Sequence, residues 1–344
     1  MSVVPAGSKI LVTGITGFIA AHVAEQLLAA GFRVRGTVRS LAKAEHLKQR
    51  FASYGDKVEF TVVEDLEKDG GFDEAVKGVA GIAHVASPFH YKVEDPWKDL
   101  INPAVRGTLS LLEAAAATEG IHRVVITSSF AAIAHPAAPG YKFTEEDWNN
   151  WALKEVEEKG KDVAPAVAYR ASKAEAERKT WTFVKERKPK FDVVTINPVF
   201  VFGPIITDVP SPDAIPTSVG LLYKYLAGEH KSIDAGSPSN AFVDVRDVAK
   251  AHVEALVRPE AGGQRFLTSA GTLSWQEVAD ILRELYPDRP IPKGNPGKIR
   301  NGDETIVYGE RANKVLGIDF IQLKQSVKDT AEILVQLEKK WAAR

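Results

Sequence analysis

The chain has 344 residues, which is enough for one large α/β domain and a smaller lobe. Its 44 lysine and arginine residues balance 45 aspartate and glutamate residues, so the charge indicates neither a nucleic-acid partner nor an anionic membrane. The chain has no cysteine, which excludes disulfides and thiolate chemistry, and its eight histidines show no metal-ligand spacing. We therefore expect no metal site.

Signals for secretion and membrane insertion are also missing from the sequence. Met1–Lys9 lacks a charged region followed by an apolar run. No apolar stretch reaches the roughly 18 residues that a membrane span needs. With the lack of cysteine, these features lead us to expect a cytoplasmic protein without a membrane partner, either a monomer or a homodimer.

The N-terminal region predicts a strand, a glycine-bearing turn, a helix and a second strand. The three regular elements are expected at Lys9–Thr13, Ala20–Ala30 and Phe32–Val38. The turn between the first two has the spacing Gly14-x-x-Gly17-x-x-Ala20. The first glycine permits a tight turn, and the second lets backbone amides approach a pyrophosphate at the helix N-terminus. This region therefore predicts a dinucleotide site.

Apolar strands and helices continue to alternate along the chain. Strands are expected at Val58–Val63, Gly81–Val85, Val124–Ser128 and Phe191–Asn197, and helices at Phe72–Val76, Trp97–Thr118 and Ala171–Val184. Such alternation predicts an α/β fold with a doubly wound parallel Rossmann sheet, covered by helices on both faces.

The composition changes after the sixth strand, where Gly203–Pro216 contains four prolines. Beyond it, Ala241–Val245 predicts a strand that rejoins the sheet and Arg246–Leu256 a helix. We expect residues 1–203, with about 240–258, to form the nucleotide-binding domain. Residues 204–239 and 259–344 should form a smaller, discontinuous substrate lobe, with helices at Trp275–Leu285 and Gln322–Lys340.

Two basic residues follow the second strand. NAD-dependent enzymes usually place a carboxylate at this strand end to hold the ribose hydroxyls. This chain has Arg39 there, Lys43 one helical turn on, and no acidic residue until Glu45. An arginine suits a 2′-phosphate by its charge and its planar donor fork. The sequence therefore predicts NADP(H) as the cofactor.

Tyr169 and Lys173 are spaced to lie on one face of a helix. A fixed ammonium near a tyrosine stabilises the phenolate and lowers the pKa of the hydroxyl from about 10 toward the working range. The pair can therefore serve as an acid/base unit. Ser129 follows a neighbouring strand, so its hydroxyl is expected at the same edge of the sheet.

Together these motifs resemble the extended short-chain dehydrogenase/reductase family over nearly the whole chain. The dihydroflavonol-reductase-like branch is the most similar, in particular fungal NADPH-dependent carbonyl reductases of the methylglyoxal/isovaleraldehyde reductase type. The strings that carry this finer placement are His84-Val-Ala-Ser87-Pro88-Phe89, Glu145-Glu-Asp-Trp148-Asn149, Asn197-Pro198-Val-Phe-Val-Phe-Gly203-Pro204 and Asp244-Val-Arg-Asp247-Val-Ala-Lys-Ala-His252.

The resemblance implies a set of site residues and a reaction. Ser129, Tyr169 and Lys173 would be catalytic in the reduction of a small aldehyde or ketone to an alcohol. Phe89 and Phe130 would line an apolar substrate wall. Cofactor contacts would come from Gly14, Ile15, Thr16, Gly17, Phe18, Ile19, Arg39, Lys43, Asp65, Leu66, Ala86, Ser87, Tyr169, Lys173, Pro198, Val201 and Ser218.

One position departs from the family pattern. Shorter members carry an asparagine three residues before a glycine of the long helix as a proton-relay element, whereas this chain has Ala104 before Gly107. Water would have to replace that side chain. Two other functions stay open: a nucleotide-sugar epimerase or dehydratase of the same family, and a non-catalytic dinucleotide sensor. The substrate and the stereochemistry cannot be predicted.

Overall fold

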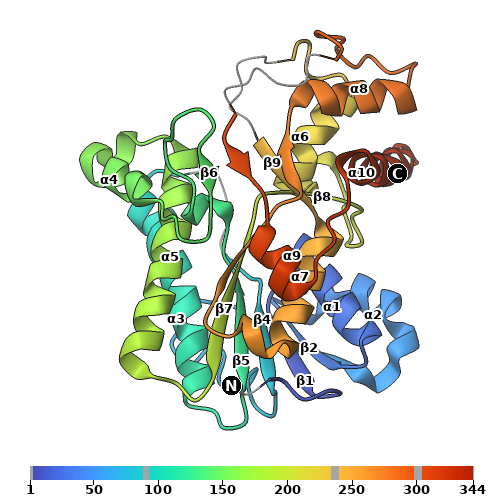
Figure 1. The fold of residues 1–344 in the computed structure, drawn as a ribbon. Helices are drawn as coiled ribbons and strands as arrows, with labels where there is room; N and C mark the ends of the chain where they lie inside the picture. Colours follow the sequence, from blue (N-terminus) through green and yellow to red (C-terminus); the bar gives the residue numbers. More distant parts are fainter. Residues whose placement is uncertain (1–2, 88–92, 234–239, 298–303, 344) are drawn as a thin grey trace.

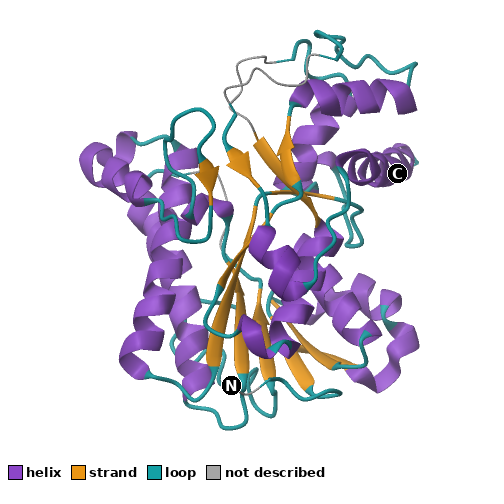
Figure 2. Cartoon of the chain, in the orientation of Figure 1, coloured by secondary structure: helices purple, strands orange, loops and turns teal. Residues whose placement is uncertain are grey.

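The structure is a computed structural model that describes residues 3–87, 93–233, 240–297 and 304–343. Its centre is a seven-stranded parallel sheet in the order β10-β7-β5-β4-β1-β2-β3 (Figures 1 and 2). The strands are β1 Lys9–Val12, β2 Arg33–Val38, β3 Val58–Val62, β4 Gly81–His84, β5 Arg123–Thr127, β7 Asp192–Pro198 and β10 Arg265–Thr268. This order and the parallel pairing are those of a Rossmann sheet, as predicted.

Helices cover both faces of the sheet because each strand buries side chains in alternate directions. One face packs against α1 Phe18–Ala29, α2 Glu45–Arg50, α7 Val245–Val257 and α9 Glu310–Leu316. The opposite face packs against α3 Asn102–Ala116 and α5 Pro165–Arg187. On β1, the side chains of Ile10 and Val12 pack into the core on the side of α1 and α7, and Leu11 between them packs into the core on the side of α3.

A smaller lobe stands above the carboxyl ends of the strands in Figure 1. It contains β8 Phe200–Phe202, β9 Asn240–Asp244 and β11 Gly271–Leu273 in one sheet, with α6 Thr217–Leu226, α8 Trp275–Leu285 and α10 Leu323–Ala342. These elements share an apolar core that includes Phe202, Leu222, Leu282 and Leu334.

Shorter elements complete the fold. β6 Lys142–Phe143 pairs in parallel with β12 Ile306–Val307, and α4 Asn150–Lys159 packs on α5. A π-helical turn, η3 Trp97–Ile101, precedes α3. The short 3-10 helices are η1 Leu41–Ala44, η2 Ala52–Lys57, η4 Phe130–Ala132, η5 Gly160–Asp162, η6 Pro212–Ala214 and η7 Pro259–Ala261. Among the described helices, none is long and apolar enough to cross a membrane.

Three predicted elements need correction. Phe72–Val76 forms turns rather than a helix, although both end residues are buried. α5 begins at Pro165, six residues before the predicted start at Ala171. The strand predicted at Ala241–Val245 lies in the lobe sheet between β8 and β11, and β10 is the strand that returns to the main sheet. The proposed domain boundaries, which used that strand, stay a prediction.

A serine cap starts the helix α8. Ser274 Oγ accepts a hydrogen bond from Glu277 N at 3.1 Å, which satisfies one amide of the first turn. A Ser274→Ala variant is expected to lose about 1 kcal/mol of unfolding free energy. Urea unfolding would measure the loss. A Ser274→Asp variant keeps an acceptor and should unfold near the original midpoint, and equal stability of the alanine variant would contradict the capping role.

Candidate active site

The carboxyl ends of β1 and β4 meet at the point where the strand order reverses, which is where such sheets bind ligands. Thr13 Oγ1 accepts hydrogen bonds from the backbone amides of Val85 and Ala86, each at 3.0 Å. Gly14 has a φ of 63°, and a Cβ there would lie 3.0 Å from Ala86 Cβ. A side chain at position 14 would therefore both strain the turn and crowd the neighbouring strand end.

The turn from Gly14 to Ile19 leads into α1, whose N-terminus has no capping side chain. Gly17 is the N-cap residue, and the first turn of the helix carries no acidic residue. The orphan amides and the positive end of the helix dipole therefore favour an anion. Thr37 Oγ1 accepts a hydrogen bond from Gly14 N at 2.9 Å and fixes the turn from β2. No motif in the sequence marks Thr37 for this contact.

Arg39 and Lys43 lie beyond the carboxyl end of β2, and both side chains are exposed. Neither makes an ion pair with any part of the chain that the structure describes. Two cations without a carboxylate partner beside the glycine turn are available for an anionic group such as a phosphate.

The other proposed cofactor residues lie on several strand ends. Asp65 and Leu66 follow β3, Ala86 and Ser87 follow β4, Pro198 ends β7, Val201 lies in β8, and Ser218 lies in the first turn of α6. Phe89 lies outside the described residues. Phe130 follows Ser129 and packs edge-on against Phe143, with 5.3 Å between the ring centroids.

Helix α5 brings Tyr169 and Lys173 to the carboxyl end of the sheet. Lys173 Nζ lies 6.0 Å from the centre of the Tyr169 ring and donates a hydrogen bond to Ser87 Oγ at 3.0 Å. Ser129 stands at the next strand end, where its Oγ accepts a hydrogen bond from Ala131 N at 3.1 Å. Tyr169 and Ser129 are half-buried, so both hydroxyl groups lie between the core and the surface.

Burial of Lys173 lowers the pKa of its ammonium group. The ammonium loses hydration, which lowers the pKa of Lys173 to about 8, while the negative charge of Glu177 opposes that shift. His84 is buried behind it and contacts Thr13 Oγ1 through Nδ1 at 2.9 Å. Burial first, and then the charge of Lys173, lower the pKa of His84 to about 3. His84 is therefore a neutral, hydrogen-bonded core residue.

A doubly wound sheet with a glycine turn at its switch point defines a Rossmann-fold dinucleotide-binding protein. The model of the NAD dependent epimerase/dehydratase family matches residues 10–267. The chain belongs to this family of extended short-chain dehydrogenases/reductases, which confirms the resemblance seen in the sequence.

Its relatives include fungal reductases. A ketoreductase of Aspergillus niger is 38% identical over 95% of this chain and 98% of its own. Aldehyde reductase 2 of Sporidiobolus salmonicolor is 38% identical over 86% of each chain. The crystal structure of yeast methylglyoxal/isovaleraldehyde reductase complexed with NADPH is 33% identical and aligns with a TM-score of 0.84, covering 96% of this chain and 99% of that one.

Proposed function

We propose that this protein is an NADPH-dependent carbonyl reductase that converts aldehydes or ketones to alcohols by Ser-Tyr-Lys catalysis. Ketoreductases and aldehyde reductases that align with nearly the full chain support an oxidoreductase of this type. The observation that carries the proposal is the placement of Tyr169 and Lys173 on α5, with Lys173 bound to Ser87 after β4 and Ser129 following β5, at the same end of the sheet as the uncapped N-terminus of α1.

The residues of the turn fit the cofactor. The turn from Gly14 to Ile19 would hold the pyrophosphate through the first-turn amides at the N-terminus of α1. Arg39 and Lys43 would hold the 2′-phosphate. Asp65 and Leu66 would lie at the adenine and Ala86 and Ser87 along the ribose, while Pro198, Val201 and Ser218 would line the nicotinamide end. When bound, NADPH supplies the hydride.

Side chains of the protein would stabilise the carbonyl oxygen of the substrate and supply the proton. The Ser129 and Tyr169 hydroxyls donate hydrogen bonds to that oxygen and stabilise the negative charge that develops on it. Tyr169 then transfers its proton to the oxygen. Lys173 stabilises the phenolate that remains, so the tyrosine can give up a proton near neutral pH. Phe130 would form part of the apolar wall, and the smaller lobe would supply the far side of the substrate pocket.

The two alternatives have weaker support. Nucleotide-sugar enzymes of this family need a site for a diphosphate, and the likeness to UDP-glucose 4-epimerase of Thermotoga maritima, at 21% identity, shows the fold alone. A non-catalytic sensor has no need of a tyrosine and a lysine on one helix face. A panel of aldehydes, α-keto esters, diketones and aryl ketones, followed by NADPH and NADH oxidation, tests the proposal. Failure to turn over any carbonyl would overturn it.

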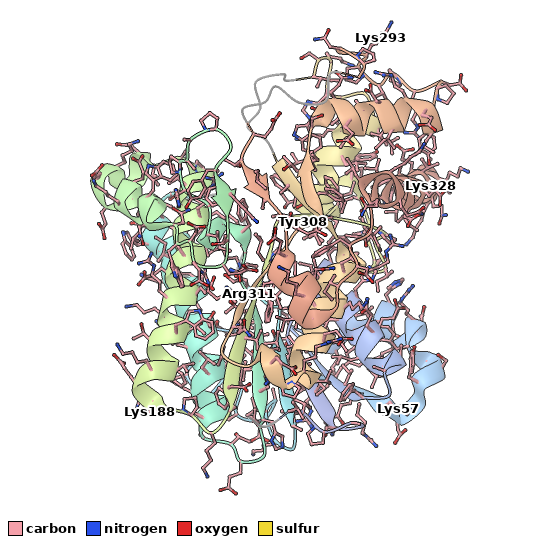
Figure 3. All side chains as sticks on the ribbon, viewed as in Figure 1. Lys57, Lys188, Lys293, Tyr308, Arg311 and Lys328 are labelled. Carbon is pink, nitrogen blue, oxygen red and sulfur yellow. The ribbon has the colours of Figure 1, made fainter. Side chains whose placement is uncertain are left out.

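Arg39 is the side chain expected to set the choice of cofactor. An Arg39→Ala variant should lose one charged contact to the 2′-phosphate, so kcat/KM for NADPH falls roughly 10–100-fold. The value for NADH, which lacks that phosphate, should change little. Lys57→Ala is the matched control, because Lys57 (Figure 3) precedes β3 at the amino end of that strand, whereas Arg39 follows the carboxyl end of β2. An equal loss for both cofactors would contradict the role of Arg39.

A further inference from the structure

A buried ion pair lies next to the proposed catalytic residues. Arg265 Nε of β10 donates to Glu177 Oε1 at 2.6 Å, and the two side chains are 9% and 1% exposed. Glu177 follows Lys173 by four residues on α5, so it lies on the same helix face one turn further on. Burying two charges is costly unless their remaining polar groups are also satisfied, which makes the surroundings of this pair informative.

Glu177 is the centre of a dense hydrogen-bond network. Its Oε2 accepts from Ser128 Oγ at 2.5 Å and from Asn197 Nδ2 at 2.7 Å. Its Oε1 accepts from Thr195 Oγ1 at 3.0 Å, in addition to Arg265. Donors from β7, β10 and the residue that follows β5 thus converge on one carboxylate of α5. Both carboxylate oxygens are satisfied, while Arg265 Nη2 has no hydrogen-bond partner among the described residues. Such a dense buried network fixes the relative positions of the elements that contribute to it.

The network reaches Ser129 through two neighbouring contacts. Asn197 Nδ2 donates not only to Glu177 but also to the backbone oxygen of Ser129, at 3.2 Å. The hydroxyl of Ser128 binds Glu177, and its backbone amide donates a hydrogen bond to Ile196 O at 2.8 Å. The backbone from the Ser128 amide to the Ser129 carbonyl oxygen is therefore held at both ends. The orientation of this backbone segment determines where the Ser129 hydroxyl points.

The network also reaches Lys173. A small cavity of about 20 Å³ is lined by residues that include Lys173, Glu177, Ser87 and Ser128, and it has room for roughly one water molecule. The negative charge of Glu177 favours the ammonium form of Lys173, which burial disfavours. The carboxylate is thus placed to keep the neighbouring lysine charged.

Arg265 also binds the segment that follows Phe143. One terminal nitrogen of Arg265 donates to the backbone oxygens of Glu145, at 2.5 Å, and Asp147, at 2.8 Å. The guanidinium carbon lies 3.8 Å from the centre of the Trp148 ring, a cation–π contact. Arg311, labelled in Figure 3, adds an ion pair to Glu146 at 2.6 Å.

We propose that Glu177 is a positioning residue of the active site, which orients Ser129 through Asn197 and holds Lys173 in its charged form. The role rests on the proposed carbonyl-reductase function. Arg265 neutralises the buried carboxylate and anchors the network to β10. Neither residue touches the reacting atoms.

A Glu177→Gln variant tests both parts of this role. Glutamine has a similar shape, but its amide nitrogen is a donor that would face other donors, and it carries no charge. We expect kcat to fall about tenfold with the carbonyl KM changed less than about threefold, because the defect lies in transition-state stabilisation. We also expect the alkaline limb of the kcat profile to move to lower pH, as the lysine loses its proton more readily. The titratable groups facing Lys173 are His84 of β4, with Tyr169 and Glu177 of α5.

Two further variants separate the orientation of Ser129 from the effect on the charge of Lys173. Asn197→Ala removes the link to Ser129 but keeps the carboxylate, so kcat should fall while the alkaline limb stays in place. Glu175→Gln is the control on the same helix. Glu175 is 15% exposed, its one ion pair among the described residues is with Lys179 at 3.4 Å, and the variant should behave like the unaltered protein.

Unaltered kcat and pH profile in a folded Glu177→Gln variant would overturn the inference. If that variant does not fold, unaltered kcat in Asn197→Ala would do so. Tyr169→Phe keeps this outcome distinct from a failure of the proposed function. Loss of activity in Tyr169→Phe with normal Glu177→Gln would reject only the positioning role, whereas an active Tyr169→Phe would reject the catalytic assignment itself.

Discussion

A Tyr169→Phe variant is expected to reduce carbonyl compounds roughly 10²–10⁴-fold more slowly than the unaltered protein, the usual contribution of a positioned acid. The substitution removes one hydroxyl from a half-buried side chain and leaves the ring in place. Both the proton donor and one hydrogen bond to the developing oxyanion are lost. Since both act mainly in the transition state, kcat should carry most of the loss.

The measurement combines steady-state turnover with direct binding of NADPH. Binding should change little, because the phosphate-holding turn and Arg39 are untouched. Tyr54→Phe is the matched control: Tyr54 packs against Phe51 in the helical layer and has no proposed part in the reaction. Near-normal turnover in a folded Tyr169→Phe variant would remove the tyrosine from the mechanism, even if the protein still reduced carbonyls.

Local patterns were enough to predict the fold class and the positions of most elements. The alternation of apolar strands and helices determines a parallel sheet, and glycines at positions 14 and 17 mark its first turn. The start of α5 was missed although Pro165 is a typical first helical residue, because the alanine- and glutamate-rich run beyond Ala171 gave a stronger signal. A periodic pattern predicts that a helix exists better than it predicts its ends.

The choice between β9 and β10 could not be made from local sequence. Both are short apolar runs, and which sheet each joins depends on distant partners. In the lobe, Phe242 of β9 stacks on Phe202, whereas Phe266 of β10 enters the main core. Arg265 also interrupts the apolar pattern of β10, and the carboxylate that makes its burial tolerable is Glu177, 88 residues earlier. That pairing is set by the tertiary fold.

The sequence gives only a weak indication that Glu177 lies near the active site. It follows Lys173 by four residues, so the same helix periodicity that joined Tyr169 to Lys173 extends to a carboxylate on that face. Acidic residues on a helix usually face solvent, and the neighbouring Glu175 does so in part. Only the packing of α5 against β5 and β7 shows that Glu177 is buried among donors.

A Lys173→Met variant is expected to lose activity and gain stability. Lys173 is 9% exposed, and burial lowers the pKa of its ammonium from 10.5 to about 8. Without the cation, the phenolate of Tyr169 is no longer stabilised, and kcat should fall roughly 10²–10³-fold, as for removal of other electrostatic groups. The buried charge also destabilises the folded state, and a thioether of similar length removes that cost.

The sign of the pH dependence follows from proton binding. Between about pH 8 and 10.5 the folded protein binds fewer protons at Lys173 than the unfolded chain does, so this group makes unfolding harder as pH rises. Below pH 8 the full cost of the buried charge is present. At pH 7 we therefore expect the methionine variant to exceed the unaltered protein by about 1–3 kcal/mol in unfolding free energy. That advantage should shrink as pH approaches 10.

Urea unfolding at pH 7 and pH 10, with turnover measured on the same samples, tests this trade-off. Lys179→Met is the surface control on α5, where a half-exposed ammonium pairs with Glu175 at 3.4 Å. It should change stability by less than about 1 kcal/mol and leave kcat unaltered. A stability gain for Lys173→Met that is the same at both pH values would show that packing, not charge, is responsible. A destabilised variant would mean that the hydrogen bond to Ser87 outweighs the cost of burial, and that the active-site lysine is held without strain.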